Sequence, residues 1–129
     1  MKIQLKNTRV EKLNFVFDDS IEDDDFSFAF ANGFVEEDVN FFVVKFDIKL
    51  TSTQGYRLEL EYVAEFNTDE PVNIEFKESM FPIVNAPAIA YPYLRSYVSI
   101  VTLNSGYEPI ILPTVNFQSL ASNPDRAVN

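Results

Sequence analysis

Carboxylates dominate the side chains with which this chain could do chemistry. The 129 residues include 20 Asp and Glu and 10 Lys and Arg, with neither His nor Cys. Without imidazole or thiol groups the chain lacks Ser-His-Asp and Cys-His nucleophile systems, thiolate zinc sites and disulfides. Paired carboxylates could still cleave glycosidic bonds, but that chemistry needs one acid with a raised pKa. Because the acids here cluster in predicted loops and on outward strand faces, the composition favours a protein that is not an enzyme and needs no cofactor.

The acidic residues are densest over residues 18–25, which read DDSIEDDD. Their spacing is similar to that of a calcium loop, yet the segment lacks the Gly and the closing bidentate Glu of such loops. Crowded like charges favour a solvated connector. We interpret the segment as a loop, with a dedicated calcium site as the less favoured alternative.

The net charge of -10 limits the partners that the chain can attract. Phosphate backbones would be repelled, so we expect no nucleic acid partner and a preference for basic ones. No run of about 18 apolar residues is present for a membrane-spanning helix, and no apolar leader follows Met1. The sequence therefore predicts a cytoplasmic protein without membrane insertion.

Hydrophobic residues make up 47% of the chain, 13 of them Phe, and the length suits a single domain over residues 1–129. Apolar and polar residues alternate over residues 1–17, 26–31, 42–51 and 56–66, with a bend expected near Asn7. Period two predicts antiparallel strands with one buried face. Asn32 and Gly33 predict a hairpin turn. Residues 72–76 are expected to be extended, and residues 79–84 to form a loop.

A long helix is expected between Asn85 with Pro87, which are typical of a helix start, and Gly106, which is typical of a helix end. One face carries Ala86, Ile89, Tyr93, Tyr97, Ile100 and Leu103. The opposite face carries Ala88, Tyr91, Leu94, Val98 and Val101, and the only polar stripe is Arg95, Ser99 and Thr102. A helix that is apolar on both sides needs burial on both sides. We expect one side to lie on the sheet and the other to pack on a second subunit or receive a ligand.

The C-terminal part contains Pro109 and Pro113, which keep residues 107–117 extended and out of a central strand. Residues 118–129 can form at most one helical turn before Asn123 and Pro124. The expected fold class is α+β: a four-stranded antiparallel sheet covered by one long helix, followed by a Pro-rich extended C-terminal segment.

Residues 81–117 resemble the C-terminal half of the SecB protein-export chaperones. The run YPYLR from Tyr91 to Arg95 is similar to the Phe-Pro-Tyr-Ala-Arg helix of that family, and LPTVNF from Leu112 to Phe117 is similar to its Leu-x-Pro-Val-Asn-Phe segment. The resemblance implies a SecB-like fold, a homodimer or homotetramer, and an ATP-independent chaperone that holds unfolded polypeptide clients. The alternative within the family is a dedicated adaptor with one partner, such as the antitoxin of a toxin–antitoxin pair.

The resemblance also implies site residues. Clients would bind along a groove between the helix and the crossover loop that joins the first two strands. The candidates carried over by position are Phe26, Phe28, Ile89, Tyr93, Tyr97 and Phe117. Core packing is the alternative for each, and Tyr93 is favoured for function because its hydroxyl tolerates a wet groove edge.

A second implied surface is the outward face of the fourth strand, where Glu59 and Glu61 would contact the translocase motor SecA. The sequence departs from the family nearby, with Lys12 or Leu13 at an acidic position of the first strand and Arg57 close to Glu59. A solvated strand face that blocks aggregation is therefore the alternative for these two acids.

Overall fold

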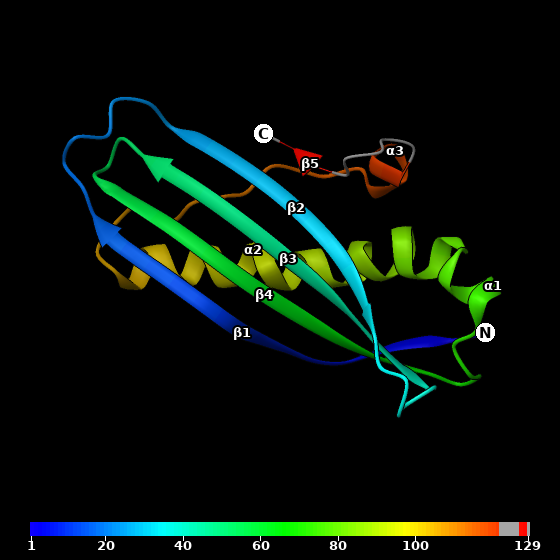
Figure 1. Cartoon of the computed structure of the whole chain (residues 1–129). Helices are drawn as coiled ribbons and strands as arrows, with labels where there is room; N and C mark the ends of the chain where they lie inside the picture. The colour runs from blue at the N-terminus through cyan, green and yellow to red at the C-terminus, as the bar shows by residue number, and fades with distance from the viewer. Residues whose placement is uncertain (122–126, 129) are drawn as a thin grey trace.

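The chain forms one antiparallel sheet with a long helix across one face, in a computed structural model that describes residues 1–121, 127 and 128 (Figure 1). Its elements are β1 (Ile3–Phe17), β2 (Asp25–Phe34), β3 (Phe41–Ser52), β4 (Tyr56–Thr68), α1 (Ile74–Lys77), the π-helical turn η1 (Phe81–Asn85), α2 (Ala86–Asn104), α3 (Phe117–Ala121) and β5 (Ala127–Val128). The strand order is β1-β4-β3-β2-β5, and every neighbouring pair is antiparallel. The predicted α+β class is confirmed. The two-residue strand β5 was not predicted, and Asn123 and Pro124 lie outside the described residues.

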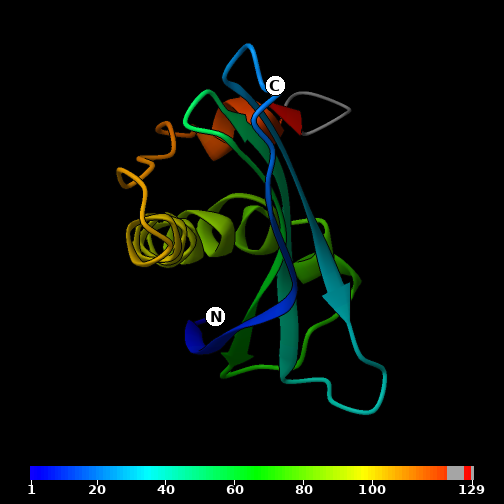
Figure 2. The ribbon, with the colours of Figure 1, turned by 90° about the vertical axis from the view of Figure 1, so that its left-hand side faces the viewer.

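The core lies between α2 and one face of the sheet, as the period-two pattern predicted. Leu58 and Leu60 of β4 and Phe46 and Ile48 of β3 are all buried, while Lys45 and Asp47, which alternate with the two β3 residues, are exposed. Figure 2 shows that α2 covers only one face of the sheet. Alternate side chains of each strand thus enter the core, and the others form a polar outer face.

Strand β1 is an edge of the sheet and bends along its length. Its register against β4 shifts between Leu5 and Asn7 and again between Val10 and Lys12. The bend expected near Asn7 is confirmed. Such bulges increase local twist and let the long strand follow the curved sheet.

The hairpin turn predicted at Asn32 and Gly33 is wrong. Both residues lie inside β2, where Asn32 pairs with Val44 and Gly33 with Val43. A Cβ at Gly33 would meet Val43 Cγ2 at 2.7 Å, and the Asn32 amide donates to the Pro82 carbonyl at 2.6 Å. Both residues therefore serve close packing within the strand, and the chain turns only after Phe34.

The region before α2 is more helical than the sequence suggested. Residues 72–76 were predicted to be extended, but most of them belong to α1 or cap it. Asn73 is the N-cap of α1, and its side-chain oxygen accepts a hydrogen bond from the Phe76 amide at 2.8 Å. The predicted loop contains η1, which runs directly into α2. Asn85 has helical dihedrals and makes no capping hydrogen bond, so the helix starts a turn earlier than predicted.

The end of α2 is as predicted. Gly106 has φ 95°, which glycine adopts readily, and the Tyr107 amide donates back to the Thr102 carbonyl at 3.1 Å. The predicted polar stripe is wrong at Thr102, which is fully buried. Its hydroxyl bonds to the Val98 carbonyl at 2.9 Å, so the polar group is satisfied inside the core.

Candidate functional site

The two sides of α2 have different environments. Ala90, Leu94 and Val98 are fully buried against the sheet. On the other side lies a row of large apolar residues that we name the α2 stripe: Ile89, Tyr93, Ile100 and Leu103, each between 42% and 56% exposed. The helix thus covers the core with one side and presents apolar surface with the other.

The α2 stripe adjoins the edge strand β1. Tyr97, half-buried beside the stripe, lies 5.6 Å from the ring of Tyr62 in β4, and Tyr62 pairs with Val10 of β1. Val10 and Leu13 share the helix-facing side of β1 and are both exposed. One apolar surface therefore runs from α2 to β1, an edge strand that has β4 as its only strand neighbour among the described residues.

A separate groove lies between the sheet and the extended segment after α2. We name it the crossover groove; it has a volume of about 550 Å³. Its lining residues are Asp24, Asp25, Phe26, Leu50, Thr51, Ile110, Ile111, Leu112 and Pro113. Ile111 is 70% exposed, so the groove offers large apolar side chains beside the carboxylates of the crossover loop.

Side chains of α2 hold the extended wall of this groove. The Tyr91 hydroxyl donates to the Pro113 carbonyl at 2.5 Å. Ser99 Oγ donates to the Ile110 carbonyl at 2.6 Å, and the Ile110 amide donates to Thr102 Oγ1 at 3.0 Å. Burial raises the pKa of Tyr91 to about 12, so this phenol stays protonated and remains a donor at neutral pH. The wall is therefore fixed without belonging to a sheet.

Some carboxylates of the crossover loop are engaged within the chain. The amide and hydroxyl of Ser20 both donate to Asp18, and these hydrogen bonds lower the pKa of Asp18. Asp24 Oδ1 accepts from the Thr53 amide at 2.7 Å. Within the described part of the chain, Glu22 and Asp25 make no side-chain ion pair or hydrogen bond, so they are free to meet a basic partner.

The six predicted client-binding residues do not form one surface. Phe26 lines the crossover groove, whereas Ile89 and Tyr93 belong to the α2 stripe, with Tyr97 at its border. Phe28 and Phe117 are core residues, only 1% and 4% exposed, with rings 6.1 Å apart. Their burial favours the core-packing alternative for this pair.

The predictions missed apolar residues on both surfaces. Ile110, Ile111 and Leu112 line the groove, and Val10 and Leu13 extend the α2 stripe. The run Ile-Ile-Leu between two prolines was the available signal, because a segment excluded from the sheet has no strand partner to cover it. Val10 lies on the helix-facing side only because the register of β1 shifts on either side of it, and the alternation over residues 1–17 did not predict that placement.

The outer face of the sheet carries mixed charges around Glu59 and Glu61. Lys12 Nζ lies 3.3 Å from Glu59 Oε2, and Lys45 Nζ lies 3.0 Å from Glu11 Oε1. Glu61 is half-buried and borders a shallow hollow of about 260 Å³. Glu59 is thus partly neutralised by the lysine that departs from the family pattern.

No group of three potential metal-ligating side chains occurs among residues 1–121, 127 and 128. In the same part of the chain, no helix is both long enough and apolar enough to cross a membrane.

Comparison with known proteins places most of the chain in a family. The model of the SecB family, described as preprotein translocase subunit SecB, matches residues 25–126. The chain belongs to the SecB family. The predicted resemblance, which was based on residues 81–117, is confirmed and extends to most of the chain.

Several relatives bear the name protein-export protein SecB. The SecB protein of Rickettsia akari is 29% identical over 86 residues, covering 63% of this chain and 55% of the relative. That of Roseobacter denitrificans is 33% identical over 66 residues, covering 51% and 39%. The chain thus spans about half the length, or less, of these SecB relatives.

A solved structure shares the fold. It is the Mycobacterium tuberculosis Rv1957 SecB-like chaperone in complex with a ChAD peptide from the Rv1956 HigA1 antitoxin. The TM-score is 0.69 at 18% sequence identity, with 88% of both chains covered. The predicted SecB-like architecture is therefore confirmed.

Proposed function

We propose that this SecB family member is an ATP-independent, cytoplasmic holdase that binds unfolded polypeptide segments in the crossover groove. The observation that carries the proposal is the groove itself: exposed Ile111 faces a cavity bounded by Phe26 and by crossover carboxylates. Apolar side chains can cover the apolar segments of an unfolded client without selecting a sequence. No catalytic step is needed for this role.

The acids beside the groove bias the clients that it accepts. Glu22 and Asp25 would attract Lys or Arg next to an apolar segment, and this attraction weakens as salt screens it. Burial of apolar side chains depends far less on this screening. The holdase should therefore bind clients at all salt concentrations and prefer basic ones at low salt.

Suppression of the aggregation of a reduced, unfolded model protein tests the proposal. The chain should suppress aggregation at near-stoichiometric amounts, and Ile111→Asp should reduce this activity several-fold because a charge enters the apolar wall. Val16→Asp, at an exposed valine on the outer side of β1, is the matched control. Absence of suppression at any stoichiometry would remove the general-holdase function.

A dedicated adaptor is the second candidate function. It is favoured by the structural neighbour, whose complex contains a peptide of one antitoxin. A dedicated partner should be recovered from native cells in a stoichiometric complex that depends on the same groove. If instead a broad set of clients is recovered, and each is lost in Ile111→Asp, the general holdase is supported.

We also propose that the α2 stripe and the β1 edge pair subunits in a homodimer or homotetramer. Leaving Ile100 and Leu103 half-exposed costs hydrophobic stabilisation that a second copy would recover. A free strand edge beside them offers backbone hydrogen bonds to the same partner. The mass in solution tests this proposal, and a monomer at micromolar concentration contradicts it.

Glu59 and Glu61 remain our proposed contact with SecA. Lys12 beside Glu59 reduces the negative potential there, so Glu61 should carry more of such a contact. Binding to SecA should weaken more in Glu61→Lys than in Glu59→Lys. Equal and unimpaired binding in both variants would remove this surface from the proposal.

A further inference from the structure

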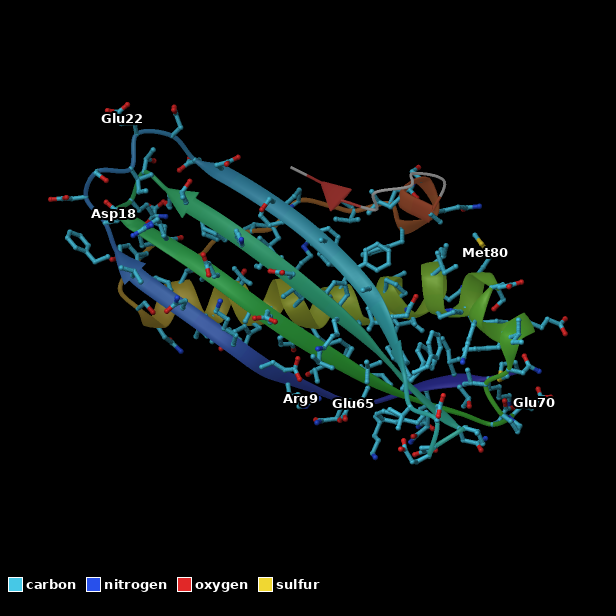
Figure 3. The ribbon with its side chains drawn as sticks, in the orientation of Figure 1. Arg9, Asp18, Glu22, Glu65, Glu70 and Met80 are labelled. Atoms are coloured by element: carbon cyan, nitrogen blue, oxygen red, sulfur yellow. The ribbon has the colours of Figure 1, made fainter. Side chains whose placement is uncertain are left out.

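A second pocket lies at the opposite end of β2 from the crossover groove. It has a volume of about 340 Å³, and we name it the hairpin pocket. Its lining residues are Phe34, Val35, Glu36, Asp38, Val39, Phe41, Val72 and Lys77. Figure 3 shows the two ends of the molecule, with Asp18 and Glu22 at the crossover end and Glu70 and Met80 at the other.

The walls of the hairpin pocket are held by hydrogen bonds between separate segments. The Val72 amide donates to the Val39 carbonyl at 2.5 Å, and the Thr68 amide donates to the Asn40 carbonyl at 2.9 Å. The Asn40 side chain donates in turn to the Thr68 carbonyl at 3.2 Å. These contacts fix the turn between β2 and β3 against the segment that leads to α1. The pocket is therefore preformed.

Apolar surface is exposed at the mouth of the pocket. Val35 and Val39 are 42% and 49% exposed, although the neighbouring Phe34 is packed against the core. A large apolar side chain entering the pocket would cover both valines. The exposure of these two valines adds nothing to the stability of the core. Exposed apolar side chains beside a pocket are typical of a binding site, so a ligand would account for their position.

The charges around the pocket select the ligand. The acidic residues at this end are Glu36, Glu37, Asp38, Asp69, Glu70, Glu75 and Glu78. They outnumber the nearby lysines, which are Lys77, Lys2 next to Asp69, and Lys6, whose Nζ lies 5.7 Å from the Phe41 ring centre. Glu70 pairs with the Met1 amino group at 3.0 Å, whereas within the described part of the chain Glu36 and Glu37 have no ion pair. Lys77 Nζ lies 5.0 Å from the Phe34 ring centre, so the site already accommodates one cation over an aromatic face.

We propose that the hairpin pocket is a second anchor for the same extended client, and that it takes a large apolar side chain flanked by Lys or Arg. This inference rests on the proposed holdase function and adds a spacing rule to it. Phe26 lines one site and Phe34 the other, so the sites are separated by about 26 Å along the strand. An extended client needs at least about eight residues to reach both sites.

Two-anchor peptides test the spacing rule. Each anchor is a Leu between two Arg, and a Gly/Ser linker joins the two anchors. A linker of about two residues is too short for the peptide to reach both sites, whereas a linker of about twelve residues is long enough. Fluorescence anisotropy should give at least a tenfold lower Kd for the long linker than for a single anchor, and no gain beyond a factor of two for the short one. Equal affinity of both two-anchor peptides would overturn the rule.

Variants locate the second anchor. Val39→Asp, or the milder Glu36→Lys, should abolish the gain from the long linker and leave single-anchor binding in the crossover groove intact. Val16→Asp, at a comparably exposed valine, should keep the gain. Retention of the gain in Val39→Asp and Glu36→Lys overturns the proposal.

Methyl NMR separates this inference from the proposed function. On addition of a single-anchor peptide, the methyl signals of Val35 and Val39 should shift together with that of Ile111. Shifts at Ile111 alone would leave the holdase groove and overturn the hairpin pocket. Unshifted signals at Val35, Val39 and Ile111 would overturn both proposals. Shifts of the two valines in a chain that does not suppress aggregation would support the hairpin pocket and contradict the holdase function.

Discussion

The two sides of α2 are both apolar but have opposite environments. The sheltered side is built around Ala90 and Leu94, and the exposed side around Ile100 and Leu103. Ala90 lets the helix approach the sheet closely, whereas the large residues on the other side are left half-exposed by residues 1–121, the part of the chain whose side chains are described. Tyr91 and Leu94 are buried on the sheltered side, whereas the small Ala88 is exposed. Neither hydrophobicity nor residue size alone therefore distinguishes the core side from the surface side.

Truncation of a sheltered leucine should have the largest effect. Leu94→Ala leaves a cavity in a core that cannot fully collapse, and the free energy of unfolding should fall by about 3 kcal/mol. Ile100→Ala on the exposed side should change it by less than about 1 kcal/mol in a monomer, because the side chain is half in water already. Urea unfolding followed by circular dichroism measures both variants at a concentration low enough to keep the chains apart.

The difference between the losses of unfolding free energy in the two variants tests whether the two sides of α2 are buried differently. Equal losses in Leu94→Ala and Ile100→Ala would mean that both sides of the helix are buried in the species that unfolds. Dilution then distinguishes the causes, since only a loss that comes from subunit contacts depends on protein concentration.

The sequence predicted the sheet well because period two is a local signal. In β3 and β4 the inward residues are apolar except Ser52 and Thr68, and most outward residues are polar, so the strands could be assigned without knowing their partners. The turn at Asn32 was misassigned because Asn-Gly is ambiguous. The same dipeptide that suits a tight turn also suits a strand crossed closely by another segment, here η1 at Pro82.

The candidate site was predicted less well because it depends on distant contacts. Phe28 and Phe117 could be groove or core, and only the packing of α3 against β2 decides between them. Tyr93 and Phe26 were expected in one groove, but the extended segment lies along a different side of α2 from the stripe, held there by Tyr91 and Ser99. No local pattern contains that information.

Alkaline unfolding should sharpen the contrast between the two sides through Tyr91, which lies on the sheltered side. Its pKa in the folded chain is about 12, against an ordinary value of 10, because burial opposes the phenolate. The folded state therefore holds more protons than the unfolded state between these values. The part of the stability that depends on protonated Tyr91 is fully present below pH 10. It is lost as the pH rises from 10 to 12, which lowers the free energy of unfolding by on the order of 2 kcal/mol.

Tyr91→Phe should remove this part of the alkaline loss. It should also lower stability at neutral pH by about 1 kcal/mol, since the hydrogen bond to Pro113 disappears. Tyr93→Phe is the control from the exposed side of the same helix. Urea titrations at several pH values measure the effect, and an unchanged alkaline slope in Tyr91→Phe would contradict it.

Charges placed on the exposed side should act on assembly. Ile100→Asp combined with Leu103→Asp puts two like charges where a second subunit would pack, and the dissociation constant should rise at least tenfold, about 1.4 kcal/mol. Analytical ultracentrifugation over a concentration series measures it. Ser96→Asp, an exposed polar position on the same helix, controls for added charge, and an unchanged mass distribution in the double variant would exclude the α2 stripe as the subunit interface.

Substitution of Tyr93 should have the smallest effect of these variants, and its result shows whether the exposed side of α2 binds clients as well as subunits. It combines a half-exposed ring with a hydroxyl that has no hydrogen bond within the described part of the chain, so Tyr93→Ala should cost the isolated chain little stability. If the stripe only joins subunits, Tyr93→Ala weakens assembly and leaves the affinity per chain for an unfolded client unchanged. If the stripe also touches clients, as the family resemblance predicts, that affinity falls about fivefold, or about 1 kcal/mol, at matched assembly state. Client binding by anisotropy, measured in fractions of defined mass, separates the two cases because the crossover groove is untouched by this substitution.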